Sequence, residues 1–312
     1  MNFKQIFLRN KNNKFFYYLG AVSRALIPAA WARRSLADKL RADWGADQGY
    51  IEERVNYYNK LSRPKPLSTD AIAIAEYKIP ERIRVYYFDS MEYLRFFDPA
   101  YRFQLIPGDV THIPDFPALV KSRPIAGDNE NSVLLKLDKS RHFNFIKDNI
   151  RFEDKKDKLV GRSGFSQSHR QRFFDRYAGH PLCDLAKATK SSHPNFLSIA
   201  EHLDYKFILA LEGNDVATNL KWIMSSSSIA VMPKPTYETW FMEGCLIPDV
   251  HYICISDDFS DLESKLNYYI AHQDAALRIV KEANAYMEQF KNKKREDAIS
   301  LLLLEKYFRL TH

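Results

Sequence analysis

The sequence predicts an α/β protein in which a parallel β-sheet is covered by helices. From residue 159 onward, short apolar runs alternate with helical patterns in repeated strand–turn–helix units. The chain of 312 residues is long enough for two domains or one large one. Its composition, 46% hydrophobic and 27% charged, is ordinary for a globular protein and excludes a wholly disordered chain or a coiled coil.

In the first half of the chain, the predicted elements are short. A helical pattern covers 14–42, and Pro28 is expected to break it. A connector punctuated by prolines follows at 60–68. The apolar and aromatic runs then predict strands at 84–88, 103–106 and 133–137, and a helix at 90–97.

In the second half, each strand is followed by a turn and a helix. Strands are predicted at 159–160, 207–211, 229–232 and 252–255. The matching helices are expected at 168–177, from 216, at 237–243 and from 258, and long helices fill 273–310. Because ligands of such sheets bind at the carboxyl ends of the strands, we expect the functional residues in the following turns.

The charge of the chain is concentrated at its beginning. The net charge is +7, but residues 1–42 alone carry +8 (nine basic residues against Asp38), which leaves −1 for the rest. The basic residues are Lys4, Arg9, Lys11, Lys14, Arg24, Arg33, Arg34, Lys39 and Arg41. A segment that is both basic and aromatic can bind a polyanion. The candidates are a nucleic acid and an anionic membrane surface.

Several motifs and segments that mark other classes of protein do not occur in this sequence. No apolar run reaches the ~18 residues of a transmembrane helix, and no signal peptide is indicated. Three cysteines, Cys183, Cys245 and Cys254, fit a reducing cytoplasm and have no metal-ligand spacing. No GxGxxG, P-loop, GxSxG or DxD motif occurs, so hydrolase and metalloenzyme interpretations lose ground.

Two turns of the second half carry residues suited to a phosphate. The turn at 161–164 reads GRSG, and Arg170 and Arg172 follow on the next helix as forked donors. The turn at 212–215 reads EGND and opens a helix, whose free N–H groups suit an anion. The alternatives are a solvated basic face and an ordinary capped helix.

Acidic residues follow two further strands. The helix predicted at 237–243 bears Glu238 and Glu243, and a carboxylate at a helix start can hold sugar hydroxyls or simply match the helix dipole. Asp109 follows the strand at 103–106, where it can accept a proton from a hydroxyl or serve only as a turn residue.

The block at 206–269 resembles glycosyltransferase family 90. It reads KFILALEGNDVATNLKWIMSSSSIAVMPKPTYETWFMEGCLIPDVHYICISDDFSDLESKLNYY. The likeness extends upstream through FQLIPGDVTHIPDFPALVKSRPI and NSVLLKLDKSRHF. This family includes bacterial lipopolysaccharide core glycosyltransferases, fungal capsule-associated enzymes and animal protein O-glucosyltransferases.

The resemblance implies a GT-B fold, in which two Rossmann-like domains face each other across a cleft. The expected domains are an acceptor-binding domain at 1–150, a nucleotide-sugar domain at 151–285 and a helix at 286–312 that crosses back to the first domain. The implied reaction moves a hexose, glucose or galactose, from a UDP-sugar to a sugar of the lipopolysaccharide or lipooligosaccharide core. It inverts the anomeric carbon and needs no metal or other cofactor.

The resemblance also implies roles for individual residues. Asp109 is the expected catalytic base, and Asn219 stands where the animal enzymes carry an arginine, so that Lys221 or Arg172 would neutralise the diphosphate. The expected nucleotide-sugar-binding residues are Arg162, Ser163, Gly164, Arg170, Arg172, Glu212, Gly213, Asn214, Asp215, Thr218, Asn219, Lys221, Glu238 and Glu243. The expected acceptor-binding residues are Thr111, His112, Lys121 and Arg123.

We expect this enzyme in the cytoplasm, peripheral on the inner leaflet of the bacterial inner membrane, with no nucleic-acid partner. The basic beginning of the chain would then contact anionic lipid, or it would merely pack on the first domain. Two alternative functions stay open. One is a retaining or other sugar transferase on the same fold, and the other is a non-catalytic membrane- or nucleic-acid-binding protein.

Overall fold

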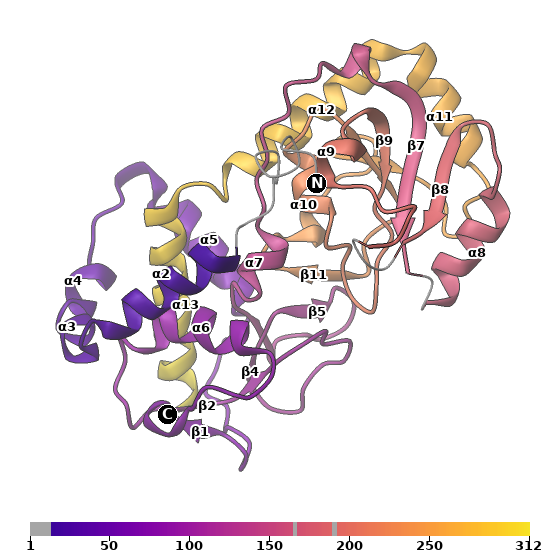
Figure 1. Cartoon of the computed structure of the whole chain (residues 1–312). Coiled ribbons are helices and arrows are strands. Elements are labelled where there is room, and N and C mark those ends of the chain that lie inside the picture. The colour runs from indigo at the N-terminus through magenta and orange to yellow at the C-terminus, as the bar shows by residue number, and fades with distance from the viewer. Residues whose placement is uncertain (1–13, 165–166, 189–191) are drawn as a thin grey trace. The chain divides into compact units, whose positions relative to one another are not determined.

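The computed structural model describes residues 14–164, 167–188 and 192–312, and the chain forms two compact units (Figure 1). The N-terminal unit comprises Asn13–Ser140, Thr236–Gly244 and Phe290–His312. The central unit includes Arg141–Pro235 and Cys245–Gln289. The short segment Thr236–Gly244 therefore belongs with the N-terminal unit, although the sequence analysis assigned it to the second domain.

A five-stranded parallel sheet forms the middle of the central unit, which confirms the α/β prediction. Its spatial order is β12-β10-β9-β7-β8, and every neighbouring pair is parallel. The strands are β7 (Lys156–Ser163), β8 (Cys183–Lys187), β9 (Tyr205–Leu209), β10 (Ile229–Met232) and β12 (Ile253–Cys254). Four of them coincide with predicted strands, whereas β8 was missed because its side chains are only half-buried.

Helices cover this sheet and bury its apolar side chains. The helices are η3 (Phe152–Asp154), α8 (Ser168–Tyr177), α9 (Ile199–His202), α10 (Leu220–Met224), α11 (Leu262–Ala271) and α12 (Gln273–Glu288). Figure 1 shows α8 beside β8, while α11 and α12 pack on each other and on the sheet. In the core, Phe173, Leu262 and Ile279 from three helices meet Phe207 and Val231 from two strands.

The N-terminal unit is built around its last helix. Its helices are α2 (Lys14–Leu26), α3 (Ala29–Arg34), α4 (Leu36–Leu40), η1 (Gly45–Asp47), α5 (Gln48–Tyr58), η2 (Ile74–Glu76), α6 (Arg84–Leu94) and α13 (Lys293–Thr311). The α13 helix packs against α4, α5 and α6 and buries ten of its residues (Figure 1). The break between α2 and α3 falls at Pro28, as predicted. A further short helix, α7 (Lys139–His142), spans the boundary between the units.

Three small sheets complete the N-terminal unit. Strands β3 (Leu105–Ile106), β4 (Ala118–Val120) and β6 (Ser132–Leu134) form a parallel sheet in the order β3-β4-β6. Strands β1 (Ile72–Ala73) and β2 (Arg102–Phe103) pair antiparallel. Strands β5 (Ser122–Pro124) and β11 (Tyr237–Thr239) pair antiparallel as well.

Two secondary-structure predictions are wrong. Residues 84–88 are not a strand but the start of α6, because the buried residues Tyr86, Asp89 and Tyr93 recur at helical spacing. Residues 237–243 are not a helix but contain β11 and the start of η4 (Glu243–Cys245). There the pairing of β11 with a strand more than 100 residues earlier overrides the local pattern.

The described residues contain no helix that is both long and apolar enough to cross a membrane. Of the basic residues counted at the beginning of the chain, Lys4, Arg9 and Lys11 lie outside the described residues.

Candidate functional site

The central sheet has a topological switch point between β7 and β9. The chain moves from β7 outward to β8, and then returns to β9 on the other side of β7 before it continues to β10 and β12. In open parallel sheets, ligands bind outside the carboxyl ends of the two strands at which the chain reverses its direction. The two segments predicted to bind phosphate lie at the carboxyl ends of these two strands. The prediction of a turn at 161–164 is wrong for its first three residues, because Gly161, Arg162 and Ser163 are the end of β7. Residues 212–215 lie in the loop that follows β9.

Arg170 of α8 joins the end of β7 to the loop that follows β9. Its Nε donates to the carbonyl of Glu212 at 2.8 Å, and its Nη2 donates to the carbonyl of Leu211 at 2.7 Å. Its Nη1 donates to Ser163 Oγ at 3.1 Å. The sequence predicted that Arg170 and Ser163 act together with the turn at 212–215, and the structure brings these residues together.

The charge of Arg170 is not balanced by a carboxylate of the part of the chain that the structure describes. Its three partners are two carbonyls and a hydroxyl, and burial lowers the pKa of the guanidinium. Arg170 also lies in the first turn of α8, where helix N–H groups have no partner inside the helix. A partly buried cation beside a helix start is a suitable place for an anion such as a diphosphate.

His169 is the residue of this edge that the sequence analysis missed. Its Nε2 lies 2.8 Å from the carbonyl of Glu212, the same oxygen that Arg170 binds. The neighbouring Gln167 donates to Asn214 Oδ1 at 3.0 Å, so α8 holds the second turn at several points. The sequence signal that was available is the cluster Ser168-His169-Arg170 at a helix start.

The other two arginines of the predicted motif do not lie with Arg170. Arg162 donates to both the carbonyl and the Oδ1 of Asp184, at 2.7 and 2.8 Å, and this ion pair neutralises it. Arg172 is exposed, and a spacing of two residues on a helix turns it away from Arg170. Of these three arginines, Arg170 is therefore the one that presents its charge between the end of β7 and the loop after β9.

The turn after β9 is longer than the sequence indicated. The α10 helix begins at Leu220, and Asn219 precedes it and donates to the carbonyl of Leu209 at 2.9 Å. Glu212, Gly213 and Thr218 are partly exposed and Asn214 is exposed, whereas Asp215 is buried. Lys221, expected to neutralise phosphate, is fully buried on α10. Gly164 directly follows β7 and is partly exposed.

Asp109 lies at the carboxyl edge of the small parallel sheet of the N-terminal unit. It follows β3, and Lys121 directly follows the neighbouring strand β4. Lys121 Nζ donates to Asp109 Oδ1 at 2.6 Å. The lysine side chain is buried, while the aspartate side chain is 35% exposed. A fixed ammonium thus orients a carboxylate that solvent and a ligand can reach.

Further contacts hold the loop that carries Asp109. The loop is fixed because Val110 N donates to Ser122 Oγ at 3.2 Å. Burial raises the pKa of the neighbouring Tyr86 to about 12, so this phenol stays protonated and does not compete as a base. Thr111 and His112, predicted to bind the acceptor, are both exposed on the same loop.

Arg123 and Glu238, predicted for the acceptor and the donor, are bonded to each other. They are opposite residues of β5 and β11, and Arg123 Nε donates to Glu238 Oε1 at 2.8 Å. The same carboxylate accepts a hydrogen bond from Tyr57 Oη. Both side chains are buried, so this geometry points to a structural pair that joins the two strands.

Glu243, also predicted to bind the nucleotide-sugar, is buried like Glu238. Its carboxylate accepts hydrogen bonds from the backbone N–H of Thr239 at 2.6 Å and from the hydroxyl of the same residue at 3.0 Å. These contacts close the turn after β11. Glu243 begins η4, but its side chain is buried and is not presented to solvent.

The chain is similar in sequence to known glycosyltransferases. A family model described as glycosyl transferase family 90 matches residues 134–312. The chain is also 43% identical, over 306 residues, to a protein of Dichelobacter nodosus named O-glucosyltransferase LpsA. That alignment covers 96% of this chain and 96% of the relative.

Proposed function

The chain belongs to glycosyltransferase family 90 and is a glycosyltransferase, and we propose that it moves a hexose from a UDP-sugar to a core sugar of lipopolysaccharide or lipooligosaccharide. The hexose is glucose or galactose. The name of the relative, an O-glucosyltransferase, supports glucose and an oxygen atom as the acceptor. The proposed reaction inverts the anomeric carbon and requires no metal.

One observation carries the donor part of the proposal. Arg170, which no carboxylate of the described residues balances, lies between the end of β7 and the loop after β9, at the switch point of the central sheet. The diphosphate of a UDP-sugar carries two negative charges and suits forked donors beside the start of α8. The proposed nucleotide-sugar contacts are therefore those of this edge, with Arg170 as the main cation.

The proposed mechanism has one displacement step. Asp109 accepts the proton of an acceptor hydroxyl while the oxygen attacks C1 of the donor sugar. The bond between C1 and the β-phosphate oxygen breaks on the opposite face, and UDP leaves with the bonding electron pair. Arg170 stabilises the charge that develops on the leaving diphosphate. This mechanism includes the GT-B arrangement, in which one unit binds the acceptor and the other the donor.

The location is part of the proposal. We place the enzyme in the cytoplasm, at the inner leaflet of the bacterial inner membrane, because the proposed acceptor is a glycolipid. The basic residues at the start of the chain favour an anionic surface.

Product analysis tests the function as a whole. The protein is incubated with truncated lipopolysaccharide and a panel of UDP-sugars, with and without EDTA, and the product is weighed by mass spectrometry. We expect a gain of one hexose that EDTA does not prevent, and a β-linkage by NMR from an α-linked donor. An α-linked product would contradict the inverting mechanism. If no UDP-sugar of the panel gives a product, a UDP-sugar is not the donor.

Arg170→Ala is expected to weaken UDP binding by about 10- to 100-fold, because a hydrogen bond to a charged group contributes about 1.5–3 kcal/mol. Isothermal titration with UDP measures this change. Arg172→Ala, two residues along the same helix and exposed, is the matched control and should bind UDP like the unmodified protein. Equal affinities in all three proteins would remove Arg170 from the diphosphate site.

A further inference from the structure

The first helix of the N-terminal unit carries its apolar residues on the outside. Leu19, Val22 and Leu26 lie at positions i, i+3 and i+7 of α2, which places them on one face, and all three are exposed. Leu26 is 79% exposed. In a helix that packs on a globular core, such a stripe normally faces inward.

The opposite face of α2 is attached to α6 by polar contacts. Tyr17 Oη donates to Asp89 Oδ1 at 2.6 Å, and Arg24 Nη2 lies 3.2 Å from Glu92 Oε2. Arg95 of the neighbouring segment donates to the backbone carbonyl of Arg24 at the end of the helix. The helix is therefore fixed with its polar face inward and its apolar face toward solvent, which is the reverse of the usual order.

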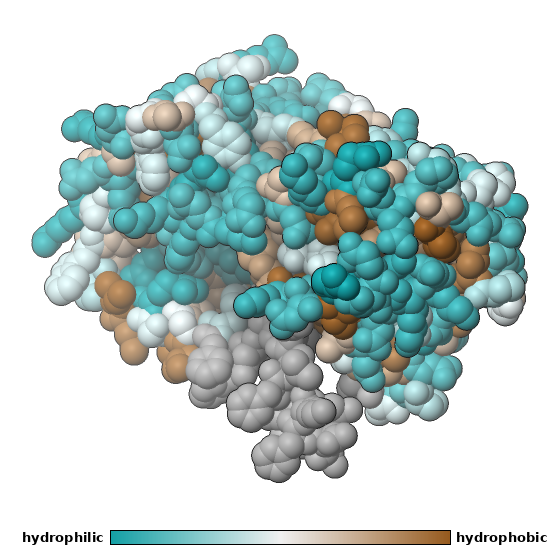
Figure 2. All heavy atoms as spheres, turned by 90° about the horizontal axis from the view of Figure 1, so that it is seen from above, coloured by the Kyte–Doolittle hydropathy of each residue, from teal (hydrophilic) through white to brown (hydrophobic). Residues whose placement is uncertain are grey.

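The apolar stripe continues past Pro28 and meets basic residues. Ile27 and Trp31 are exposed, the latter by 65%. Arg33 and Arg34 are exposed at the end of α3, two and three residues after Trp31. Hydrophobic groups reach the surface at the left of Figure 2, the side on which Figure 1 draws α2 and α3. A tryptophan between an apolar stripe and arginines is typical of a helix that lies in a membrane interface.

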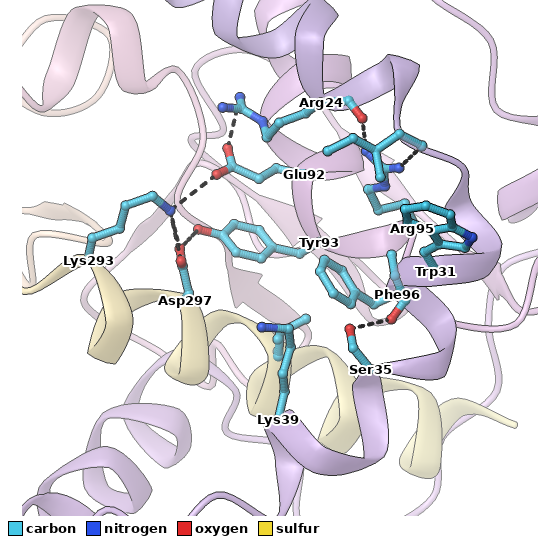
Figure 3. A pocket seen from close by; sticks show the side chains of 13 residues that line it. Arg24, Trp31, Ser35, Lys39, Glu92, Tyr93, Arg95, Phe96, Lys293 and Asp297 are labelled. Carbon is cyan, nitrogen blue, oxygen red and sulfur yellow. Dashed lines mark hydrogen bonds and ion pairs between the residues drawn. The ribbon is translucent and has the colours of Figure 1, made fainter.

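A charged cavity lies next to this stripe. Its volume is about 350 Å³, and Ile27 and Trp31 belong to its lining (Figure 3). The lining also holds four basic side chains and two acidic ones, namely Arg24, Lys39, Arg95 and Lys293 against Glu92 and Asp297. Lys39 Nζ lies 5.9 Å from the centre of the Phe96 ring at this cavity. The net positive charge beside apolar side chains suits the phosphate of a lipid headgroup.

We propose that α2 and α3 form an interfacial anchor that binds the surface of an anionic phospholipid bilayer. The stripe of Leu19, Val22, Leu26, Ile27 and Trp31 enters the boundary between headgroups and acyl chains. The lipid phosphates are bound by Arg33, by Arg34 and by the basic side chains of the charged cavity. This inference deepens the membrane part of the proposed function and names the surface responsible.

Vesicle sedimentation tests the anchor without donor or acceptor. The full chain is mixed with vesicles of phosphatidylcholine containing one quarter phosphatidylglycerol, or with phosphatidylcholine alone. We expect binding to the anionic vesicles that falls as salt is raised. Leu26→Gln with Trp31→Gln should reduce this binding at least about ten-fold, because two large apolar side chains leave the interface.

Matched variants separate the anchor from general surface properties. Ile79→Gln with Ile247→Gln removes two apolar side chains that are 53% and 54% exposed elsewhere, and should leave binding unchanged. Arg33→Gln with Arg34→Gln should reduce binding about 25-fold, because each basic residue at an anionic surface contributes a factor of about five. Arg63→Gln with Arg82→Gln, an equal loss of exposed charge in the same unit, should have little effect.

Three outcomes would overturn the anchor. The first is that the unmodified protein does not bind the anionic vesicles. The second is that the matched control variants lose as much vesicle binding as the anchor variants. The third is that the protein is a dimer which Leu26→Gln with Trp31→Gln converts to a monomer, because the stripe would then bind a second copy of the chain. Transfer to a detergent-dispersed acceptor is measured in parallel. Intact transfer without vesicle binding would contradict the anchor alone, and vesicle binding without transfer would contradict the proposed enzyme alone.

Discussion

Asp109→Asn is expected to lower the rate of sugar transfer by about 10²- to 10⁴-fold, the usual contribution of a general base. The amide has the shape of the carboxylate but cannot accept the proton of the acceptor hydroxyl. The exposed position of Asp109 and its contact with the buried Lys121 make it the carboxylate of this loop that is both reachable and oriented. Initial rates at saturating donor and acceptor measure the change.

The design separates catalysis from folding and donor binding. Removing a carboxylate beside a buried lysine costs stability, so thermal melting must show that the variant is folded at the assay temperature. UDP affinity should not change. Asp115→Asn, an exposed aspartate six residues along the same loop, is the matched control and should transfer sugar normally. A folded Asp109→Asn protein with nearly full activity would exclude Asp109 as the base.

The central sheet was predictable from sequence because of how parallel strands are buried. Strands such as β9 and β10 are covered on both faces, so they read as continuous apolar runs, and all their residues are indeed buried. The segments at the ends of the strands could be found for the same reason. The sequence therefore predicts Ser163 at the end of β7, Arg170 on α8 and Glu212 after β9 as parts of one site, and the structure joins them by hydrogen bonds.

The secondary structure and the side-chain roles of residues 236–244 could not be predicted from their local sequence. Glu238 reads as a helix-start carboxylate in the sequence, yet its partner Arg123 is 115 residues away and faces it across an antiparallel strand pair. A pairing between distant segments leaves no periodic signal in either of them. The same limit applies to Arg162, whose neutralisation by Asp184 depends on the parallel pairing of β7 with β8.

One buried carboxylate, that of Glu296, holds α13 to three segments that are distant from it in the sequence. Its Oε1 accepts from Arg54 Nη2 of α5 at 3.0 Å. Its Oε2 accepts from Lys136 Nζ at 2.8 Å and from Trp240 Nε1 at 2.6 Å. Burial alone would raise the pKa of Glu296, but Lys136 and Arg54 together lower it below its usual value. Glu296 is therefore ionised and joins α13 to the rest of the N-terminal unit.

Glu296→Gln is expected to lower the free energy of unfolding by about 3–5 kcal/mol, as when one partner of a buried ion pair is removed. The amide NH2 group of the glutamine faces N–H donors and cannot accept a hydrogen bond from them. Arg54 and Lys136 also lose the negative charge that Glu296 of α13 supplies. Urea unfolding at neutral pH measures the loss.

The control and the pH dependence make this prediction specific to the buried charge. Glu305→Gln on the same helix breaks an exposed pair with Arg309 and should cost no more than about 1 kcal/mol. Because the pKa of Glu296 is lowered on folding, its contribution is present above pH 4.5, the value for an unperturbed glutamate, and is lost as the pH falls through the lower folded value. The unmodified and Glu296→Gln proteins should therefore approach each other in stability in acid. A constant difference down to the lowest pH at which both proteins fold would mean that the side chain stabilises α13 by its packing and not by its charge.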